Sequence, residues 1–198
     1  MRYKFLTLFL AAMALVSFSA CSDNDKEDVQ DNIDKAVAMM AGSYTGVASA
    51  STMFSENSDT AHVNWTIGTQ GIHVDSLPLR LLSVGVYNDS ILAQSFSDAG
   101  KTPVQGAYQF TNIGMSSFAF NVVTELSFKM KLNGEQHDMY VVPGKNALVC
   151  TGYYDMVRQE LHFDVNYKSV TDSTAHTVIP LGNDKGVTIS FASTKRNS

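Results

Sequence analysis

The sequence predicts a mainly β fold, an antiparallel barrel or sandwich of about ten strands, with an N-terminal helix and one or two short helices near residues 78–99. Three observations predict this class: apolar and polar residues alternate over many short segments, turn-forming residues separate these segments, and an Asn-Gly pair follows the longest one. The chain has 198 residues, of which 44% are hydrophobic, enough to build one folded domain. Alternation alone leaves the choice between a barrel and a sandwich open.

Residues 1–20 have the three-part pattern of a secretory signal peptide. Arg2 and Lys4 precede an almost wholly apolar run over residues 5–18, and small residues follow to Ala20. The run is shorter than the roughly 20 residues that a membrane-spanning helix needs. We therefore expect a signal peptide that is removed rather than a membrane span.

The segment that follows, Phe18-Ser19-Ala20-Cys21, resembles the lipobox of bacterial lipoproteins. The resemblance implies that Cys21 is acylated, with palmitate as one of its acyl chains, and becomes the first residue of the mature protein. Residues 22–28 are rich in acids, which is typical of a solvated tether. They also resemble the acidic signal that directs lipoproteins of Bacteroidetes to the cell surface. The implied location is the outer membrane, with the domain facing the periplasm or the cell surface.

The lipidated acidic tether is predicted to continue into a helix, together covering residues 21–41. Apolar residues recur there at helical spacing, and a glycine follows as a helix stop: Val29, Ile33, Val37, Met40 and Gly42. From residue 42 the period changes to two, and no repeat or low-complexity linker follows. Residues 42–198 are therefore predicted to form a single β-rich domain.

The longest alternating segment has apolar residues at nearly every even position from 118 to 132. Because usual strands have about 3 to 10 residues, this one is predicted to bend near Thr124-Glu125 and to serve two parts of a curled sheet. Other strands are predicted near residues 44–51, 61–67, 72–76, 106–111, 147–154, 160–168, 174–181 and 187–192.

Asn133-Gly134 is predicted to form a type I′ turn, which fixes the register of the hairpin around it. The predicted cross-strand pairs are Leu132 with Glu135, Met130 with His137, Phe128 with Met139, Leu126 with Val141 and Lys129 with Asp138. This register places the apolar pairs on one face and the opposite charges on the other.

Residues 78–99 fit neither period. Asn88-Asp89 is a candidate cap for a short helix that runs to Ala99 and stops at Gly100. We expect one or two short helices here, packed against one end or face of the sheet.

Charge and motifs exclude several function classes. The formal net charge is -5 and the pI is about 5.4, which argues against a nucleic-acid partner. The chain has no Gly-x-Ser-x-Gly, no His-Glu-x-x-His, no phosphate-binding glycine loop and no calcium loop. The histidines are scattered, and the register places His137 on the opposite face from Asp138. We expect a protein that is not an enzyme, with no catalytic residue, no metal and no cofactor.

Cys150 lies in a strand-like apolar run and has no partner once Cys21 carries a lipid. A lone cysteine in such a run is usually a small buried hydrophobe, because a nucleophilic thiolate needs a neighbouring histidine or cation. We expect Cys150 to be structural.

The aromatic residues offer a binding surface. Five are candidates to line a pocket or to form a platform for a sugar ring or an apolar ligand: Trp65, Tyr140, Tyr153, Tyr154 and Tyr167. Their alternative place is the core, where strand aromatics usually lie.

Gly42-Ser43-Tyr44-Thr45-Gly46 resembles the Gly-x-Tyr-x-Gly start of Bacteroidetes lipoproteins grouped in domain families of unknown function, some with calycin-like barrels. The residues also have a physical explanation: the glycines relieve crowding where a strand enters a curved sheet, and Tyr44 plugs the end of that sheet. The expected function is a non-catalytic envelope lipoprotein that binds a small apolar or glycan ligand. A cell-surface protein-interaction or assembly subunit is the alternative.

Overall fold

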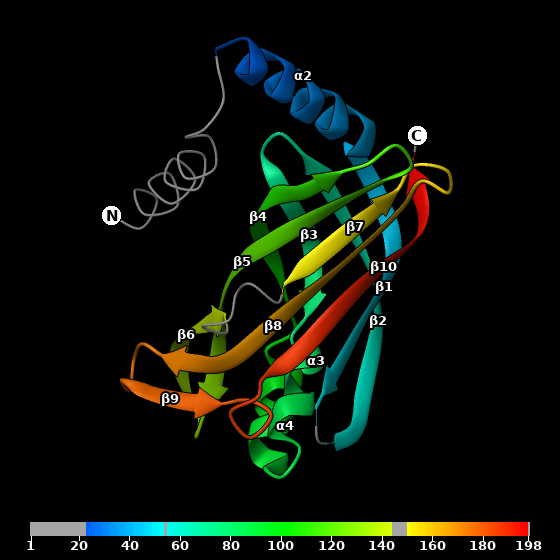
Figure 1. The fold of residues 1–198 in the computed structure, drawn as a ribbon. Helices are drawn as coiled ribbons and strands as arrows, with labels where there is room; N and C mark the ends of the chain where they lie inside the picture. The colour runs from blue at the N-terminus through cyan, green and yellow to red at the C-terminus, as the bar shows by residue number, and fades with distance from the viewer. Residues whose placement is uncertain (1–22, 54, 144–149, 198) are drawn as a thin grey trace.

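The computed structural model describes residues 23–53, 55–143 and 150–197. A single antiparallel sheet of 10 strands dominates it (Figure 1), which confirms the predicted fold class. The strands are β1 (Gly42–Thr52), β2 (Ser55–Gly68), β3 (Gly71–Pro78), β4 (Lys101–Ile113), β5 (Ser117–Leu132), β6 (Glu135–Pro143), β7 (Thr151–Asp155), β8 (Glu160–Asp172), β9 (Thr177–Pro180) and β10 (Val187–Asn197).

The sheet closes on itself. Its order is β10-β1-β2-β3-β4-β5-β6-β8-β7, and two additional pairings join β10 to β8 and β5 to β7. The pairings therefore run in a closed circuit, and the sheet is ring-like rather than a stack of two separate sheets. Among the described strands, β9 pairs only with β8 and lies off this circuit.

Strand β5 serves two parts of the ring, as its length predicts. On one edge, residues 117–121 pair with β7 and residues 126–132 pair with β6, so its partner changes around Thr124-Glu125. The predicted hairpin register with β6 is confirmed at every pair, and Lys129 Nζ lies 3.6 Å from Asp138 Oδ1. The Asn-Gly turn and the alternation therefore determined this hairpin.

Strand β8 continues beyond its predicted end at residue 168. A bulge interrupts the alternation there, which is why the prediction stopped at that residue. Tyr167 lies opposite Pro143 and Ser169 lies opposite Val142, so Lys168 is an extra residue in β8. The inward-facing positions consequently shift from odd numbers, ending at Tyr167, to even numbers, beginning at Val170.

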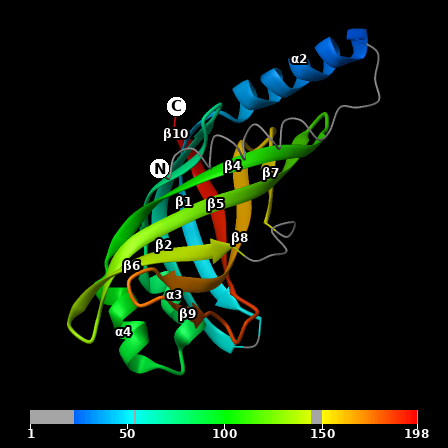
Figure 2. The same ribbon diagram turned by 90° about the vertical axis from the view of Figure 1, so that its left-hand side faces the viewer.

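Helix α2 (Asp23–Met40) packs against one end of the ring by its last turns and projects beyond it (Figures 1 and 2), close to the predicted span. Its residues Ala36 and Met40 are buried. Its C-terminus is held by side chains of the sheet: the Tyr44 hydroxyl donates to the Met40 carbonyl oxygen at 2.6 Å, and Arg196 donates to the Ala41 carbonyl oxygen. Tyr44 is itself fully buried, as expected of a residue that plugs this end.

Three short helical segments cover the opposite end: α3 (Arg80–Ser83), η1 (Val84–Val86) and α4 (Ser90–Asp98). The predicted cap is confirmed, because Asp89 Oδ1 accepts from the Leu92 N–H at 2.9 Å. Gly100 follows α4 with φ +80°, a conformation that favours glycine. Leu81, Leu82 and Phe96 are buried against this end of the ring.

The ring interior is filled by side chains. At its α2 end, the Trp65 ring stacks on Tyr44 with centroids 6.1 Å apart and meets Phe163 and Phe191 edge-on. In the described part of the chain, no helix is both long enough and apolar enough to span a bilayer.

Candidate functional site

The five aromatic candidates fall into two groups on opposite faces of the sheet. Trp65, Tyr154 and Tyr167 point into the ring and are buried, whereas Tyr153 and Tyr140 point outward with 49% and 40% of their surface exposed. Strand alternation causes this division, since Tyr153 and Tyr154 are consecutive in β7 and must face opposite sides. The five residues therefore do not line one surface.

The buried candidates have structural partners. The Tyr167 hydroxyl shares a 2.8 Å hydrogen bond with Thr124 Oγ1, and burial raises the pKa of Tyr167 well above its usual value. Arg196 donates to the Tyr154 hydroxyl at 3.3 Å. Among the described atoms, the buried Trp65 Nε1 has no hydrogen-bond partner.

Tyr153 forms a stacked pair with His162 on the outer face of the ring. The two residues lie directly opposite each other on β7 and β8, their ring centroids are 4.7 Å apart, and their planes differ by 11°. His162 therefore covers one face of the Tyr153 ring and restricts its rotation, so a half-exposed tyrosine is held in a defined orientation.

The other side of Tyr153 faces a small residue. Ala119 on β5 is the cross-strand neighbour of Tyr153, and Asn112 on β4 lies beyond it. A methyl group is too short to cover an aromatic ring, so this face of Tyr153 has no large neighbour in its own row of the sheet. Asn121 on β5 belongs to the next outward-facing row. We call Tyr153, His162, Ala119, Asn112 and Asn121 the Tyr153 platform.

The platform carries little charge of its own. Residues 102–124, which include its β4 and β5 members, contain no charged side chain. Acidic side chains border it: Glu160 Oε2 lies 3.8 Å from His162 Nε2, and Asp155 and Asp164 follow at the next outward positions of β7 and β8. Chemically, the platform offers an aromatic face flanked by amide groups, which suits an uncharged ring with hydroxyl groups.

Tyr140 belongs to a different part of the outer face. It lies opposite Ser127 on β5 and Thr171 on β8. Burial, and then the nearby charge of Glu125, raise the pKa of Tyr140. Ser127 and Ala119 are far apart along β5, about 26 Å at 3.3 Å per residue. Tyr140 and Tyr153 therefore do not contact one small ligand.

The sequence did not predict a buried pair of a carboxylate and a histidine at the β8–β9 turn. The Asp172 side chain is almost fully buried, and its Oδ2 lies 2.6 Å from His137 Nδ1. Its Oδ1 accepts from the backbone N–H groups of Thr174 and Ala175 at 2.9 and 3.0 Å. Burial by itself raises the pKa of Asp172, but these hydrogen bonds together outweigh it and lower the pKa below its usual value.

This pair reinforces the turn. Asp138, the neighbour of His137 in β6, donates its N–H to Thr174 Oγ1 at 3.0 Å and accepts from the Ser173 N–H at 2.8 Å. The only sequence signal was Asp172-Ser173-Thr174, a typical turn start; finding His137 required the β6–β8 register. In the described ranges, no group of three or more His, Cys, Asp or Glu side chains is arranged to hold a metal.

A comparison with protein families identifies the domain. The model of the DUF4840 family, described as a domain of unknown function, matches residues 39–171, more than half of the chain. The chain belongs to the DUF4840 family. No curated protein matches it, and no solved structure does either.

The DUF4840 match includes every residue of the Tyr153 platform. It also includes Cys150, which is buried as predicted. The Cys150 Sγ accepts from the Asn166 N–H at 3.2 Å, and burial is the main reason that the pKa of the Cys150 thiol is raised. Cys21, the predicted lipidation site, lies outside the described residues and before the match. β10, which closes the ring, lies after the match.

Proposed function

We propose that this DUF4840 protein is a non-catalytic envelope lipoprotein that binds a neutral glycan on the Tyr153 platform. One observation carries the proposal: a half-exposed tyrosine ring is held flat against His162 while its other side faces the small residue Ala119. Such a ring is available for stacking and is already oriented before a ligand arrives.

Physical chemistry favours a sugar at such a surface. The C–H face of a pyranose packs on an aromatic ring, and the hydroxyl groups at its rim need donors and acceptors such as the amides of Asn112 and Asn121. Because His162 restricts Tyr153, binding loses less rotamer entropy than it would on a free side chain.

The outer face is a better place for this ligand than the ring interior. Aromatic side chains pack the interior at its α2 end, where the last turns of α2 are buried, and α3, η1 and α4 cover the other end. A ligand inside the ring would have to displace Trp65 and its neighbours, whereas the platform is open to solvent without any rearrangement.

The proposed anchor is the lipid on Cys21. The lipobox-like segment ends two residues before α2 begins, and α2 leads directly to one end of the ring. The domain would then be held at the outer membrane, facing the periplasm or the cell surface. Replacing Cys21 with Ser is expected to prevent labelling with palmitate and to move the protein from the membrane fraction to the soluble fraction of host cells. A Cys150→Ser variant is the matched control and is expected to stay membrane-bound.

The binding proposal is tested with an array of neutral glycans, followed by calorimetry on the glycans that bind. Tyr153→Ala is expected to weaken binding by about fivefold or more, because one stacked ring contributes on the order of 1 kcal/mol or more. Tyr140→Ala removes an equally exposed tyrosine far from the platform and is expected to leave affinity unchanged. Equal affinities for the two variants would rule out the platform.

A protein-interaction or assembly subunit is the second candidate. It is favoured by exposed apolar side chains near the α3–α4 end of the ring, including Met53 and Ile91. Site-specific crosslinking from Ile91 in living cells would then capture a defined partner, and Met53→Asp would reduce the yield. The absence of any product above that of a crosslinker placed at the exposed Arg158, at the α2 end, would dismiss this candidate.

A further inference from the structure

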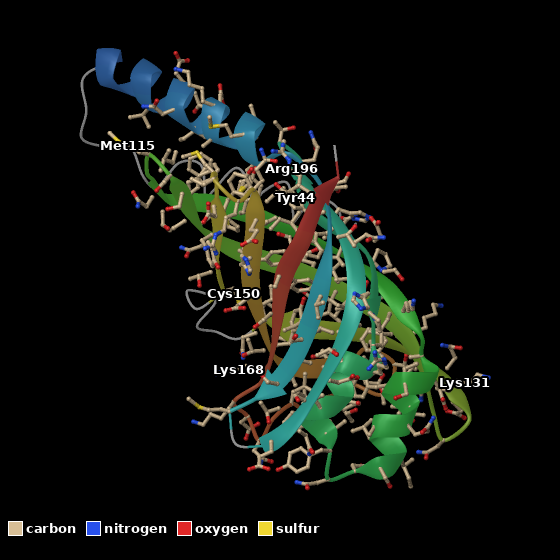
Figure 3. The ribbon with its side chains drawn as sticks, turned by 90° about the vertical axis from the view of Figure 1, so that its right-hand side faces the viewer. Tyr44, Met115, Lys131, Cys150, Lys168 and Arg196 are labelled. Carbon is tan, nitrogen blue, oxygen red and sulfur yellow. The ribbon has the colours of Figure 1, made fainter. Side chains whose placement is uncertain are left out.

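Two turns at the α2 end of the ring present apolar side chains to solvent. Met115, in the turn between β4 and β5, is 102% exposed, and Val157, in the turn between β7 and β8, is 82% exposed. Figure 3 shows Met115 beside α2, at the opposite end of the molecule from Lys131. Turns that only meet water normally carry polar residues at such positions.

The two turns are directly connected. The Met156 N–H donates to the Ser116 carbonyl oxygen at 3.0 Å. Ser117, the first residue of β5, pairs with Asp155, the last residue of β7. Met115 and Val157 therefore project from neighbouring positions of one surface. We call these two residues the apolar tips.

The β4–β5 side of the tips is uncharged, since residues 102–124 contain no charged side chain. The β7–β8 turn carries Asp155, Arg158 and Glu160, and Asp155 Oδ1 accepts from the N–H groups of Val157 and Arg158. The chain that links the ring to Cys21 arrives at this same end through α2. The first residues of α2 are acidic, which disfavours anionic lipids and favours a neutral bilayer surface.

The tips and the Tyr153 platform are also close along the strands. Ser117 pairs with Asp155 at the base of the tips, and Ala119 pairs with Tyr153 only two residues further. Two to four residues of strand span about 7 to 13 Å. The headgroup layer on each side of a bilayer is about 5 to 8 Å thick. Tips at the edge of the hydrocarbon core would thus place the platform at the outer limit of the headgroups.

We infer that the apolar tips contact the surface of the bilayer, so that the Tyr153 platform binds saccharide headgroups of membrane glycolipids rather than glycans free in solution. This inference rests on the proposed glycan function of the same platform. It assigns Met115 and Val157 to membrane contact and narrows the ligand class to neutral glycolipids.

The first experiment tests the membrane contact independently of any sugar and of natural lipidation. The chain from Ser22 onward carries an N-terminal histidine tag and is held on phosphatidylcholine vesicles that contain a nickel-chelating lipid and lipids with brominated acyl chains. Met115→Trp and Val157→Trp are expected to lose fluorescence by bromine quenching. Ile91→Trp, which replaces a 77% exposed residue at the other end, is the matched control and is expected to lose none. Trp65 is buried in the ring and contributes the same background to all variants.

The second experiment tests the ligand class. It compares the untagged chain from Ser22 onward binding to phosphatidylcholine vesicles that contain digalactosyl diacylglycerol with the same chain binding to free digalactosyl glycerol. The vesicle form is expected to bind about tenfold tighter or more, because two apolar side chains leave water. The double variant Met115→Asp with Val157→Asp is expected to lose that advantage while its affinity for the free headgroup stays the same.

The outcomes separate the two proposals. Equal quenching of Met115→Trp and Ile91→Trp, or equal affinity for the two forms of the sugar, overturns the membrane inference and leaves the platform as a site for free glycans. If the chain binds the free headgroup weakly and Tyr153→Ala does not change that affinity, the proposed function is wrong. This holds even where the fluorescence of Met115→Trp and Val157→Trp is quenched. Binding to neither form of the sugar overturns the assignment of a neutral glycolipid.

Discussion

Close packing against Trp65 explains why residue 46 is glycine. A Cβ atom at this position would lie 2.1 Å from the Ala192 carbonyl oxygen and 2.6 Å from Trp65 Cη2. The first of these contacts is with backbone that is fixed by the β1–β10 pairing. Gly46→Ala is therefore expected to destabilise the protein by about 1 to 3 kcal/mol, measured by urea unfolding. Gly68→Ala is the control, because nothing lies within 4 Å of its Cβ position. A Gly46→Ala variant as stable as Gly68→Ala would contradict this account.

The carboxylate of Asp172 makes stability depend on acid pH. Its pKa is lower in the folded protein than in the unfolded chain, because hydrogen bonds to the ionised form outweigh burial. The stabilisation is therefore fully present above the unfolded pKa of about 4 and is lost as the pH falls through the lower folded value. We expect Asp172→Asn to cost about 1 to 3 kcal/mol at pH 7. The difference from the wild type should shrink in urea unfolding curves measured below pH 4.

Asp138→Asn is the matched control for Asp172→Asn. Asp138 is one residue from His137, but its side chain is exposed and its partner is the exposed Lys129 at 3.6 Å. Exposed ion pairs contribute about 0 to 1 kcal/mol, so this variant should unfold close to the wild type at every pH. A parallel loss in both variants would show that general charge, rather than the buried pair, causes the effect.

At the residue scale, the sequence predicted features that depend on near neighbours. The cap at Asp89, the buried thiol of Cys150 and the plug at Tyr44 follow from local pattern and were confirmed. The Tyr153–His162 pair and the Asp172–His137 pair join residues on different strands. The first pair lies across the β7–β8 hairpin, whose turn does not fix the register as an Asn-Gly turn does. The second depends on the register of β6 and β8, which no short turn connects, so side-chain type alone did not reveal either pair.

Helix α2 is attached to the ring mainly through its last turn. Arg196 donates both to the Ala41 carbonyl oxygen and to the Tyr154 hydroxyl, and so links the helix to β7 and β10. Arg196→Met keeps much of the side-chain volume but removes the donors. We expect faster hydrogen exchange in α2 with little change in the sheet, measured by mass spectrometry, since local opening requires only these contacts to break. Arg158→Met, at an exposed position, should leave exchange in α2 unchanged.

At the element scale, the β5–β6 hairpin was fully predictable and the β8 strand was not. The hairpin has a two-residue turn that fixes its register and an unbroken alternation on both sides. The bulge at Lys168 reverses the alternation within β8, and a period-two pattern ends where such a reversal occurs. This explains why the predicted strand stopped at residue 168 while the real one continues to Asp172.

Closure of the ring is a property of the whole molecule that alternation does not determine. Alternation shows which face of a strand is buried, but it does not show which distant strand lies beside that strand. The sequence therefore left barrel and sandwich open. The structure closes the circuit through β10, which pairs with β1 on one edge and with β8 on the other. This strand lies beyond the segment matched by the family, so the matched segment alone leaves β1 and β8 with unpaired edges.

Proline substitutions test whether β10 closes the ring. Ser190 lies between Ser49 of β1 and Asp164 of β8, so its N–H is bonded to one of two neighbouring strands. Ser190→Pro removes that donor in the middle of a sheet and is expected to cost about 3 kcal/mol or more, with a large fall in the melting temperature measured by circular dichroism. Val178→Pro is the matched control in β9, which pairs only with β8 among the described strands, and edge strands tolerate proline. Its cost should stay within about 1 kcal/mol.

If both variants melted alike, β10 would behave as an edge strand, and the domain would be an open sheet in solution. A large difference would mean that the ring depends on its last strand for closure, and that any truncation after the family segment removes the strand that holds β1 against β8.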